Sequence, residues 1–174
     1  MLGKGRIHLY YGDGKGKTTA AMGLVMRAAG SGLSVLVYQY QKDNSSSERA
    51  VLEMIPSVTC LPGRDKVKFY SQLNGEEKVE LRKYNTKVLD EIIKFCSPFD
   101  VLLLDEVLDA VWMGLLNEDK LLGFLEHKPR RLEIILTGHQ VSQRMIDAAD
   151  YVTEMRKVKH PFDMQIAARK GIEY

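Results

Sequence analysis

The stretch IHLYYGDGKGKTT, residues 7–19, joins a continuous apolar run to a glycine-rich turn and then to the start of a helical pattern. Such a turn lets several backbone N–H groups point into one concavity, and the following helix adds its unpaired N–H groups and the positive end of its dipole. A lysine and a threonine at the helix start can then reach terminal phosphates and Mg²⁺. We therefore predict a phosphate-binding loop whose residues are Gly12, Asp13, Gly14, Lys15, Gly16, Lys17, Thr18 and Thr19.

The loop departs from the usual pattern G-x-x-x-x-G-K-[ST] at one position. That pattern places its first glycine at position 11, where this chain has Tyr11, and the glycines stand at 12, 14 and 16 instead. The alternative interpretation is an ordinary glycine-rich turn between a strand and a helix. A strand before the turn, a helix after it and GKTT in register all favour the phosphate loop.

Short apolar runs recur along the chain and are typical of strands buried on both faces of a parallel sheet. They are Ile7–Tyr11, Val35–Tyr40, Val58–Leu61, Val101–Leu104 and Ile134–Leu136. Segments with helical spacing lie between them, so right-handed crossovers are required. The pattern predicts a single domain over residues 1–174, a doubly wound α/β fold with a mainly parallel sheet and helices on both faces, like that of the P-loop nucleoside triphosphate hydrolases.

Three of the predicted helices carry start or stop signals. Ala21, Leu24, Val25 and Ala28 form an apolar face that Gly30 and Gly32 bring to an end. Asn74 and Glu77 have the spacing of a capping box, and the buried stripe of that helix is predicted at Leu81, Tyr84, Val88, Ile92 and Phe95. Ser142 is a predicted N-cap with Val141 and Ile146 as its hydrophobic staple.

Two acids follow the fourth apolar run in VLLLDE, residues 101–106. They fall at the carboxyl edge of a parallel strand, where ligands bind in such sheets. We predict that Asp105 holds Mg²⁺ directly or through water, and that Glu106 orients a metal-bound water or contacts the substrate. The alternative is a solvated acidic turn, and we expect this strand edge to be exposed to solvent.

Composition narrows the class of protein. The chain has 174 residues, 25 basic and 23 acidic, for a net charge of +2, and the basic residues are interleaved with acids, which disfavours nucleic acid as a partner. No apolar run approaches the roughly 20 residues that span a bilayer, and no secretory signal is visible, so we expect a cytoplasmic protein without a membrane segment. Cys60 and Cys96 lack metal-type spacing and are predicted to be buried thiols.

Four segments together resemble the phosphate-loop type of ATP:corrinoid adenosyltransferase, also called cob(I)alamin adenosyltransferase. They are GDGKGKTTAAMGLVMRAAG (12–30), VLLLDEV (101–107), ILTGH (135–139) and DAADYVTEMRKVKHPFDMQIAARKGIEY (147–174). The tail discriminates, because kinases share the loop but not KHPFD…ARKGIEY. The chain departs from the family in three places. Asp13 stands where Asn is common, and segment 57–75 aligns only loosely. Six residues precede the first strand, so we expect the N-terminal helical extension of some members to be missing.

The resemblance implies a reaction and roles for particular residues. Cobalt(I) of a reduced corrinoid attacks C5′ of ATP and expels triphosphate, in synthesis or salvage of the cobalamin (vitamin B12) coenzyme. Lys17 and Glu106 are the expected catalytic residues, and Thr18 with Asp105 or Glu106 the expected Mg²⁺ ligands. Phe69 and Tyr70 are expected to displace the lower axial ligand of cobalt, and the alternative is that one of the pair only pins its loop to the core. A reductant system and a homodimer are also implied.

Several residues leave two interpretations open. His139 follows a strand at the ligand edge and either contacts substrate or makes a structural hydrogen bond. Lys42, Asp43 and Ser45–Ser47 either touch a ligand or form a solvated loop. The structural interpretation is favoured for the rest, which are His8 and Trp112 in the core, His160 in a turn, and Arg130 and Arg131 on the surface. The competing functions are a P-loop small-molecule kinase and a non-catalytic ATP-dependent cofactor-delivery module.

Overall fold

The predicted apolar runs form a parallel sheet in the computed structural model, which describes residues 3–173. The strands are β1 (Ile7–Tyr11), β2 (Val35–Gln39), β3 (Val58–Cys60), β4 (Val101–Asp105), β5 (Glu133–Gly138) and β6 (Tyr151–Glu154). Their order is β3-β2-β4-β5-β1-β6, with every neighbouring pair parallel. All carboxyl ends therefore meet at one edge of the sheet.

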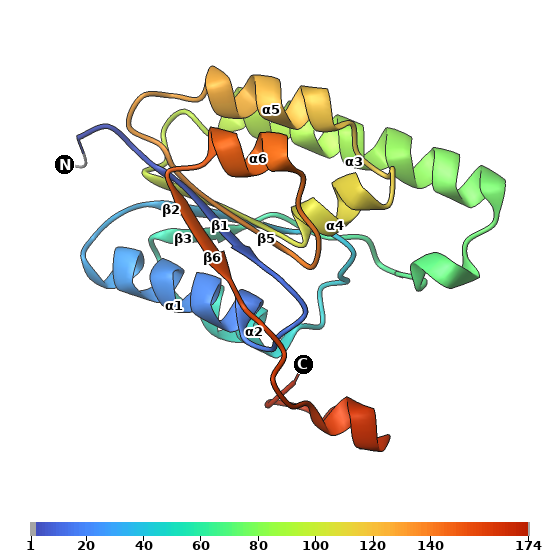
Figure 1. Ribbon diagram of the computed structural model, residues 1–174. Coiled ribbons are helices and arrows are strands. Elements are labelled where there is room, and N and C mark those ends of the chain that lie inside the picture. The colour runs from blue at the N-terminus through green and yellow to red at the C-terminus, as the bar shows by residue number, and fades with distance from the viewer. Residues whose placement is uncertain (1–2, 174) are drawn as a thin grey trace.

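Helices cover both faces of this sheet (Figure 1). The elements are α1 (Lys17–Gly30), α2 (Ser47–Leu52), α3 (Gly75–Phe95), α4 (Val107–Trp112), α5 (Glu118–Glu126) and α6 (Gln143–Ala148), with short 3-10 turns at Tyr70–Gln72 and Pro161–Met164. Helices α1 and α2 lie on one face, and α3, α5 and α6 lie on the other. The predicted fold class is confirmed.

Alternate residues along the strands pack into two separate cores, one on each face of the sheet. Leu102 and Leu104 of β4 pack in the core beneath α3 and α5, whereas Val101 and Leu103 pack against α1. This alternation follows from the period of two in a strand, and it explains why the buried strands read as continuous apolar runs.

The predicted helix starts are confirmed by their hydrogen bonds. Asn74 and Glu77 form a reciprocal capping box at the start of α3. The Ser142 side chain accepts a hydrogen bond from the backbone N–H of Met145 at the start of α6. Helix α1 buries Ala21, Val25 and Ala28 and ends at Gly30, as its pattern predicts.

Two aromatic residues predicted to be buried are exposed. Phe95 is the last residue of α3 and is 51% exposed, because the helix runs past the edge of the core and only Leu81, Val88 and Ile92 of the predicted stripe are buried, with Tyr84 half-buried. Trp112 is 62% exposed. It ends the six-residue helix α4, and the chain turns away at Gly114, which has a φ of 69°.

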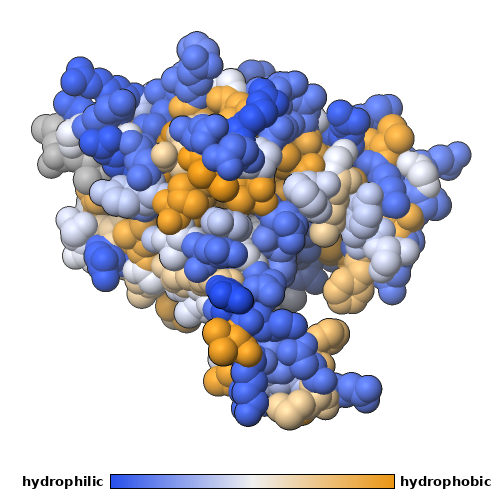
Figure 2. All heavy atoms as spheres, viewed as in Figure 1, coloured by the Kyte–Doolittle hydropathy of each residue, from blue (hydrophilic) through white to orange (hydrophobic). Residues whose placement is uncertain are grey.

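The edge strand β6 was not predicted, and the turn at His160 is the one structural feature predicted for the chain beyond it. All four residues of β6 are exposed, so the segment lacks the apolar run that signals a buried strand. Residues 155–173 then extend from the sheet and are mostly exposed (Figure 1, red). Apolar and polar side chains are interspersed on this tail (Figure 2), with Val158 at 93% and Phe162 at 75% exposure.

The remaining structural interpretations are largely confirmed. His8 is packed within β1, stacked on Tyr151 and paired with Glu133 at 2.6 Å. The His160 ring accepts a hydrogen bond from the backbone N–H of Phe162 in a turn. Arg130 and Arg131 are exposed. Cys96 is buried, but Cys60 is only partly buried because β3 lies at a sheet edge. Among residues 3–173, no helix has the length and apolarity to span a membrane.

Candidate active site at the carboxyl edge of the sheet

The predicted phosphate loop connects β1 to α1 at the carboxyl edge of the sheet. Gly16 precedes the helix with a φ of 109°, a conformation open to glycine and costly for other residues. The Lys17 ammonium donates a hydrogen bond to the carbonyl oxygen of Gly14 at 2.8 Å. Burial lowers the pKa of Lys17, and nearby acids, first among them Asp109, oppose that effect. Residues 15–19 line a cavity of about 780 Å³.

The first half of the loop is held by the chain that leaves β6. The backbone N–H of Gly14 donates to the carbonyl oxygen of Met155 at 2.6 Å, and the Asp13 carboxylate accepts from the backbone N–H of Lys157 at 2.8 Å. That hydrogen bond lowers the pKa of Asp13. A Cβ atom at Gly12 or Gly14 would come within 2.5 or 2.6 Å of the Met155 oxygen. Residues 12–14 thus brace the loop against the tail, and they are not among the residues that line the cavity.

Asp105 is the centre of a buried hydrogen-bond network. Its carboxylate accepts from Thr18 Oγ1 at 3.0 Å, Lys42 Nζ at 2.8 Å, Thr137 Oγ1 at 2.7 Å and Gln39 Nε2 at 3.1 Å. Burial acts to raise the pKa of Asp105, but the charge of Lys42 and these hydrogen bonds outweigh it, and the pKa is lowered. The side chain has 0% exposure, so the expectation of a solvated strand edge is wrong at this position.

Glu106 follows in a strained backbone conformation. Its φ of 58° lies in the left-handed region, and its backbone N–H donates to Thr137 Oγ1 at 2.8 Å. Burial raises the pKa of Glu106 to about 7, and the neighbouring charge of Lys42 only partly offsets that effect. Glu106 is one of the residues that line the cavity.

His139 and Asp109 form a second polar pair on the cavity wall. The Asp109 carboxylate accepts from the His139 backbone N–H at 2.9 Å and lies 3.1 Å from ring Nδ1. The hydrogen bond to Asp109 raises the pKa of His139, against the effect of burial. His139 therefore makes the structural hydrogen bond of one interpretation and also lines the cavity required by the other.

Oxygen donors suited to Mg²⁺ meet beside the loop. Thr18 and Asp105 are in direct contact at 3.0 Å, and Glu106 is the next residue in the chain. Among residues 3–173, no three His, Cys, Asp or Glu side chains gather as a metal site. Mg²⁺ usually takes only one or two carboxylates and completes its shell with water and phosphate oxygens. The donor set therefore fits an Mg²⁺ ion that arrives with a nucleotide.

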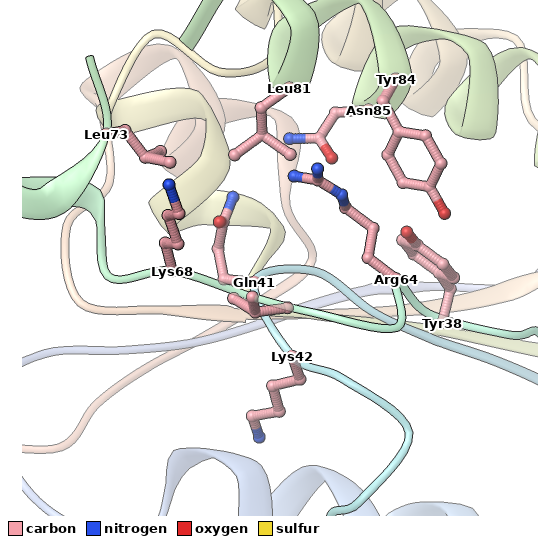
Figure 3. Close-up of a pocket in the computed structure, with 10 residues that line it drawn as sticks. Tyr38, Gln41, Lys42, Arg64, Lys68, Leu73, Leu81, Tyr84 and Asn85 are labelled. Atoms are coloured by element: carbon pink, nitrogen blue, oxygen red, sulfur yellow. The ribbon is translucent and has the colours of Figure 1, made fainter. Parts of the chain in front are cut away.

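The predicted aromatic pair lies on the wall of the same cavity. Phe69 and Tyr70 both line the cavity; Phe69 is 79% exposed, and the Lys78 ammonium lies 4.2 Å from the centre of the Tyr70 ring. A smaller hollow adjoins this wall beneath α3 (Figure 3). Gln41 extends into it with a buried Nε2 that has no hydrogen-bond partner among the described residues, and Arg64 lies over the Tyr84 ring there.

The comparisons with known proteins agree with this geometry. The model of a family described as ATP:corrinoid adenosyltransferase BtuR/CobO/CobP matches residues 3–174. The chain belongs to this family. The corrinoid adenosyltransferase of Pseudomonas aeruginosa is 31% identical over 173 residues, covering 98% of this chain and 84% of that protein. The corrinoid adenosyltransferase of Escherichia coli K12 is 32% identical over 179 residues, covering 98% and 86%.

A solved structure supports the fold of this adenosyltransferase family member. EssC (ATPases 2 and 3) from Geobacillus thermodenitrificans superposes with a TM-score of 0.51 at 15% identity, covering 96% of this chain and 35% of that chain. At that identity the likeness concerns the fold alone. The sequence resemblance stated above is confirmed by the family match.

Three polar residues of the candidate site lie outside the site residues predicted from the sequence. Gln39 lies within a predicted strand and Thr137 directly follows one, and a polar residue in or beside a buried strand is itself a signal. Asp109 lies inside the apolar segment VLDAV, where an acidic residue is likewise a signal of a functional or buried polar position. Lys42, Asp43 and Ser45–Ser47, left open between ligand contact and solvated loop, all line the cavity.

Proposed function

We propose that the protein transfers the 5′-deoxyadenosyl group of ATP to the cobalt of a reduced cob(I)alamin or other corrinoid, and releases triphosphate. One observation carries the proposal beyond family membership: a single cavity of about 780 Å³ joins the phosphate loop, the acid at position 106 and the aromatic pair Phe69 and Tyr70. A polyanion and a flat macrocycle need those two kinds of wall. This function belongs to the synthesis or salvage of the cobalamin coenzyme.

The reaction requires no general base from the protein. Cobalt(I) donates an electron pair to C5′ of the ribose, the C5′–O bond breaks, and triphosphate departs with the bonding pair. Lys17 and the backbone N–H groups of the loop take up the negative charge that develops on the leaving oxygen. The cavity holds cobalt and C5′ in line, and such positioning supplies much of the acceleration.

The acids and Thr18 have a supporting role in that step. Thr18 with Asp105 or Glu106 would hold Mg²⁺, which supplies further positive charge beside the phosphates when bound. Thr18 keeps its hydroxyl oriented through the hydrogen bond to Asp105. The hydrogen bond to Asp109 raises the pKa of His139, which favours a charged donor in the same cavity.

The aromatic pair is proposed to prepare the cobalt. Phe69 and Tyr70 would pack against the lower face of a cobalt(II) corrinoid, keep water and the axial base away, and ease reduction to cobalt(I). The high exposure of Phe69 supports this role, because a side chain that pinned its loop to the core would be buried.

The cellular setting remains part of the proposal. We infer that residues 1–174 act as one domain, that a separate reductant system supplies electrons to cobalt, and that the protein works in the cytoplasm, with a homodimer as its assembly. The near-neutral net charge of +2 supports small-molecule substrates over nucleic acid.

One experiment separates the candidate functions. The protein is incubated with ATP, Mg²⁺ and a chemically reduced corrinoid, and the phosphate product is identified by ion chromatography. Triphosphate together with an alkyl-cobalt absorption spectrum supports adenosyl transfer. Formation of ADP together with a phosphorylated acceptor would support the small-molecule kinase. ATP binding without any turnover would support the cofactor-delivery module.

A further inference from the structure

Lys42 lies between the two acids of the site. Its ammonium is 2.8 Å from Asp105 Oδ2 and 3.4 Å from Glu106 Oε1. The Lys42 side chain is 24% exposed, and that of Asp105 is fully buried. A cation of this chain thus occupies the position between the two carboxylates that are the proposed ligands of Mg²⁺.

The electrostatics of the acid pair require such a cation. The other three groups that bond Asp105 are neutral, namely the hydroxyls of Thr18 and Thr137 and the amide of Gln39. Two adjacent carboxylates in a buried position repel each other and lose hydration, and a paired cation offsets both costs. Lys42 supplies that positive charge in the nucleotide-free protein.

The backbone before Lys42 is built to aim its side chain. Gln41 has a φ of 55°, in the left-handed region that only special positions adopt. Figure 3 shows the consequence: the Gln41 amide extends into the small hollow beneath α3, while the Lys42 side chain runs the opposite way. The strained turn after β2 therefore sends consecutive side chains in opposite directions, and both residues line the small hollow as well as the large cavity.

We propose that Lys42 is a resident counter-cation: its ammonium holds Asp105 and Glu106 in the empty site, Mg²⁺ arriving with ATP displaces it, and the freed ammonium binds the triphosphate. The proposal rests on the proposed function for its nucleotide. The same carboxylate oxygens serve either the ammonium or the metal ion. Once displaced, the ammonium stays in a cavity that already contains Lys15 and Lys17, so an anion must accompany it.

Two binding measurements with opposite expected signs test the exchange. Calorimetry at pH 8 measures Mg²⁺ binding to the nucleotide-free protein and, separately, ATP binding in the presence of a chelator. In Lys42→Met, Mg²⁺ is expected to bind about tenfold more tightly because its competitor is gone, and metal-free ATP about tenfold more weakly because a cation is lost. A purely structural lysine would not move the two affinities in opposite directions.

Two further variants serve as controls. Lys42→Arg keeps a cation against the acids and is expected to bind Mg²⁺ with the affinity of the wild type. Lys68→Met removes a lysine that lines the same cavity but pairs with Glu77, and it is expected to leave Mg²⁺ affinity within twofold. An unchanged or weaker Mg²⁺ affinity in a folded Lys42→Met protein would overturn the proposal.

The wild-type protein provides a readout that needs no variant. The reactivity of Lys42 toward an amine-acylating reagent, followed by mass spectrometry, is expected to rise when Mg²⁺ alone is added and to fall when ATP follows. No change on adding saturating Mg²⁺ also overturns the proposal. Neither measurement uses a corrinoid, so the exchange can be confirmed even where triphosphate release fails and the proposed function is refuted.

Discussion

The pair of Asp109 and His139 offers a sharp test of how the cavity wall works. Asp109→Asn removes the negative charge but keeps an oxygen that can accept from the His139 backbone N–H, now 2.9 Å from the carboxylate. The hydrogen bond that His139 donates to the Asp109 carboxylate is the main cause of the raised pKa of His139, and burial acts against it. Without the carboxylate, the His139 pKa falls and fewer molecules carry an imidazolium at pH 7.

The size of the effect follows from the kind of hydrogen bond that is lost. A charged donor contributes about 1.5–3 kcal/mol and a neutral one about 0.5–1.5 kcal/mol, so the difference is about 1 kcal/mol. That corresponds to roughly fivefold weaker ATP binding near pH 7. Because the His139 side chain is 60% exposed, solvent screening reduces the expected loss to about threefold.

The assay combines an NMR titration of the His139 ring with ATP binding at several pH values. In the wild type, ATP affinity is expected to fall as the pH rises through the raised pKa of His139, and in Asp109→Asn the fall comes at lower pH. The pair also stabilises the folded state below the ordinary histidine pKa of 6.5, and that stabilisation is lost as the pH rises through the raised value. Asp119→Asn is the matched control, since Asp119 is 74% exposed and pairs with Arg144. Identical titrations of His139 in wild type and Asp109→Asn would refute the reasoning.

Further variants test the rest of the site. Lys17→Ala is expected to weaken ATP binding or turnover about 10- to 100-fold in steady-state kinetics, and near-wild-type kinetics in a folded variant would refute the phosphate loop. Asp105→Ala removes a fully buried carboxylate that four donors bond, and leaves the partly buried Lys42 charge with only its longer contact to Glu106. We expect the free energy of unfolding to fall by about 3–5 kcal/mol in urea titrations, whereas a variant as stable as the wild type would contradict the network. The pKa of Glu106 is raised from 4.5 to about 7, so the folded state binds a proton more tightly than the unfolded state does, and the free energy of unfolding falls as the pH rises from 4.5 to about 7. Glu106→Gln is expected to flatten this pH dependence in thermal melts. An unchanged pH dependence would contradict the raised pKa. Phe69→Ala and Tyr70→Ala are expected to slow adenosylation from cobalt(II) more than from chemically supplied cobalt(I), and equal losses would assign the pair to general binding.

The parts of the fold that sequence predicted are those with repeated local signals. Strand β4 is a continuous apolar run, and the box at Asn74 and Glu77 fixes the start of α3, because both depend on residues close in sequence. Strand β6 was not predicted because an exposed edge strand needs no apolar pattern. Its pairing with β1 also joins residues more than a hundred positions apart in the sequence. The exposure of Trp112 depends on where α4 ends, which its spacing does not encode.

The site divides in the same way. The phosphate loop and the acids at 105 and 106 were predictable because each motif carries its chemistry in a few adjacent residues. Lys42 could not be assigned, since its contact with Asp105 spans 63 positions and follows only from β2 and β4 lying side by side. The solvated edge expected at Asp105 was wrong for the same reason, because its three neutral partners come from three other segments.

The contact between the phosphate loop and Met155 has a consequence for how this chain can vary. A Cβ at Gly12 or Gly14 would collide with a backbone oxygen, not with a side chain. No substitution at Met155 can make room, since every residue carries that oxygen in the same place. A substitution at either glycine is therefore tolerated only if the whole segment after β6 moves. Such a movement would also break the hydrogen bond of 2.7 Å that the Met155 backbone N–H donates to the Tyr11 carbonyl oxygen. Libraries that randomise the loop should keep both glycines, and a truncation after Glu154 would remove the support that shapes the loop.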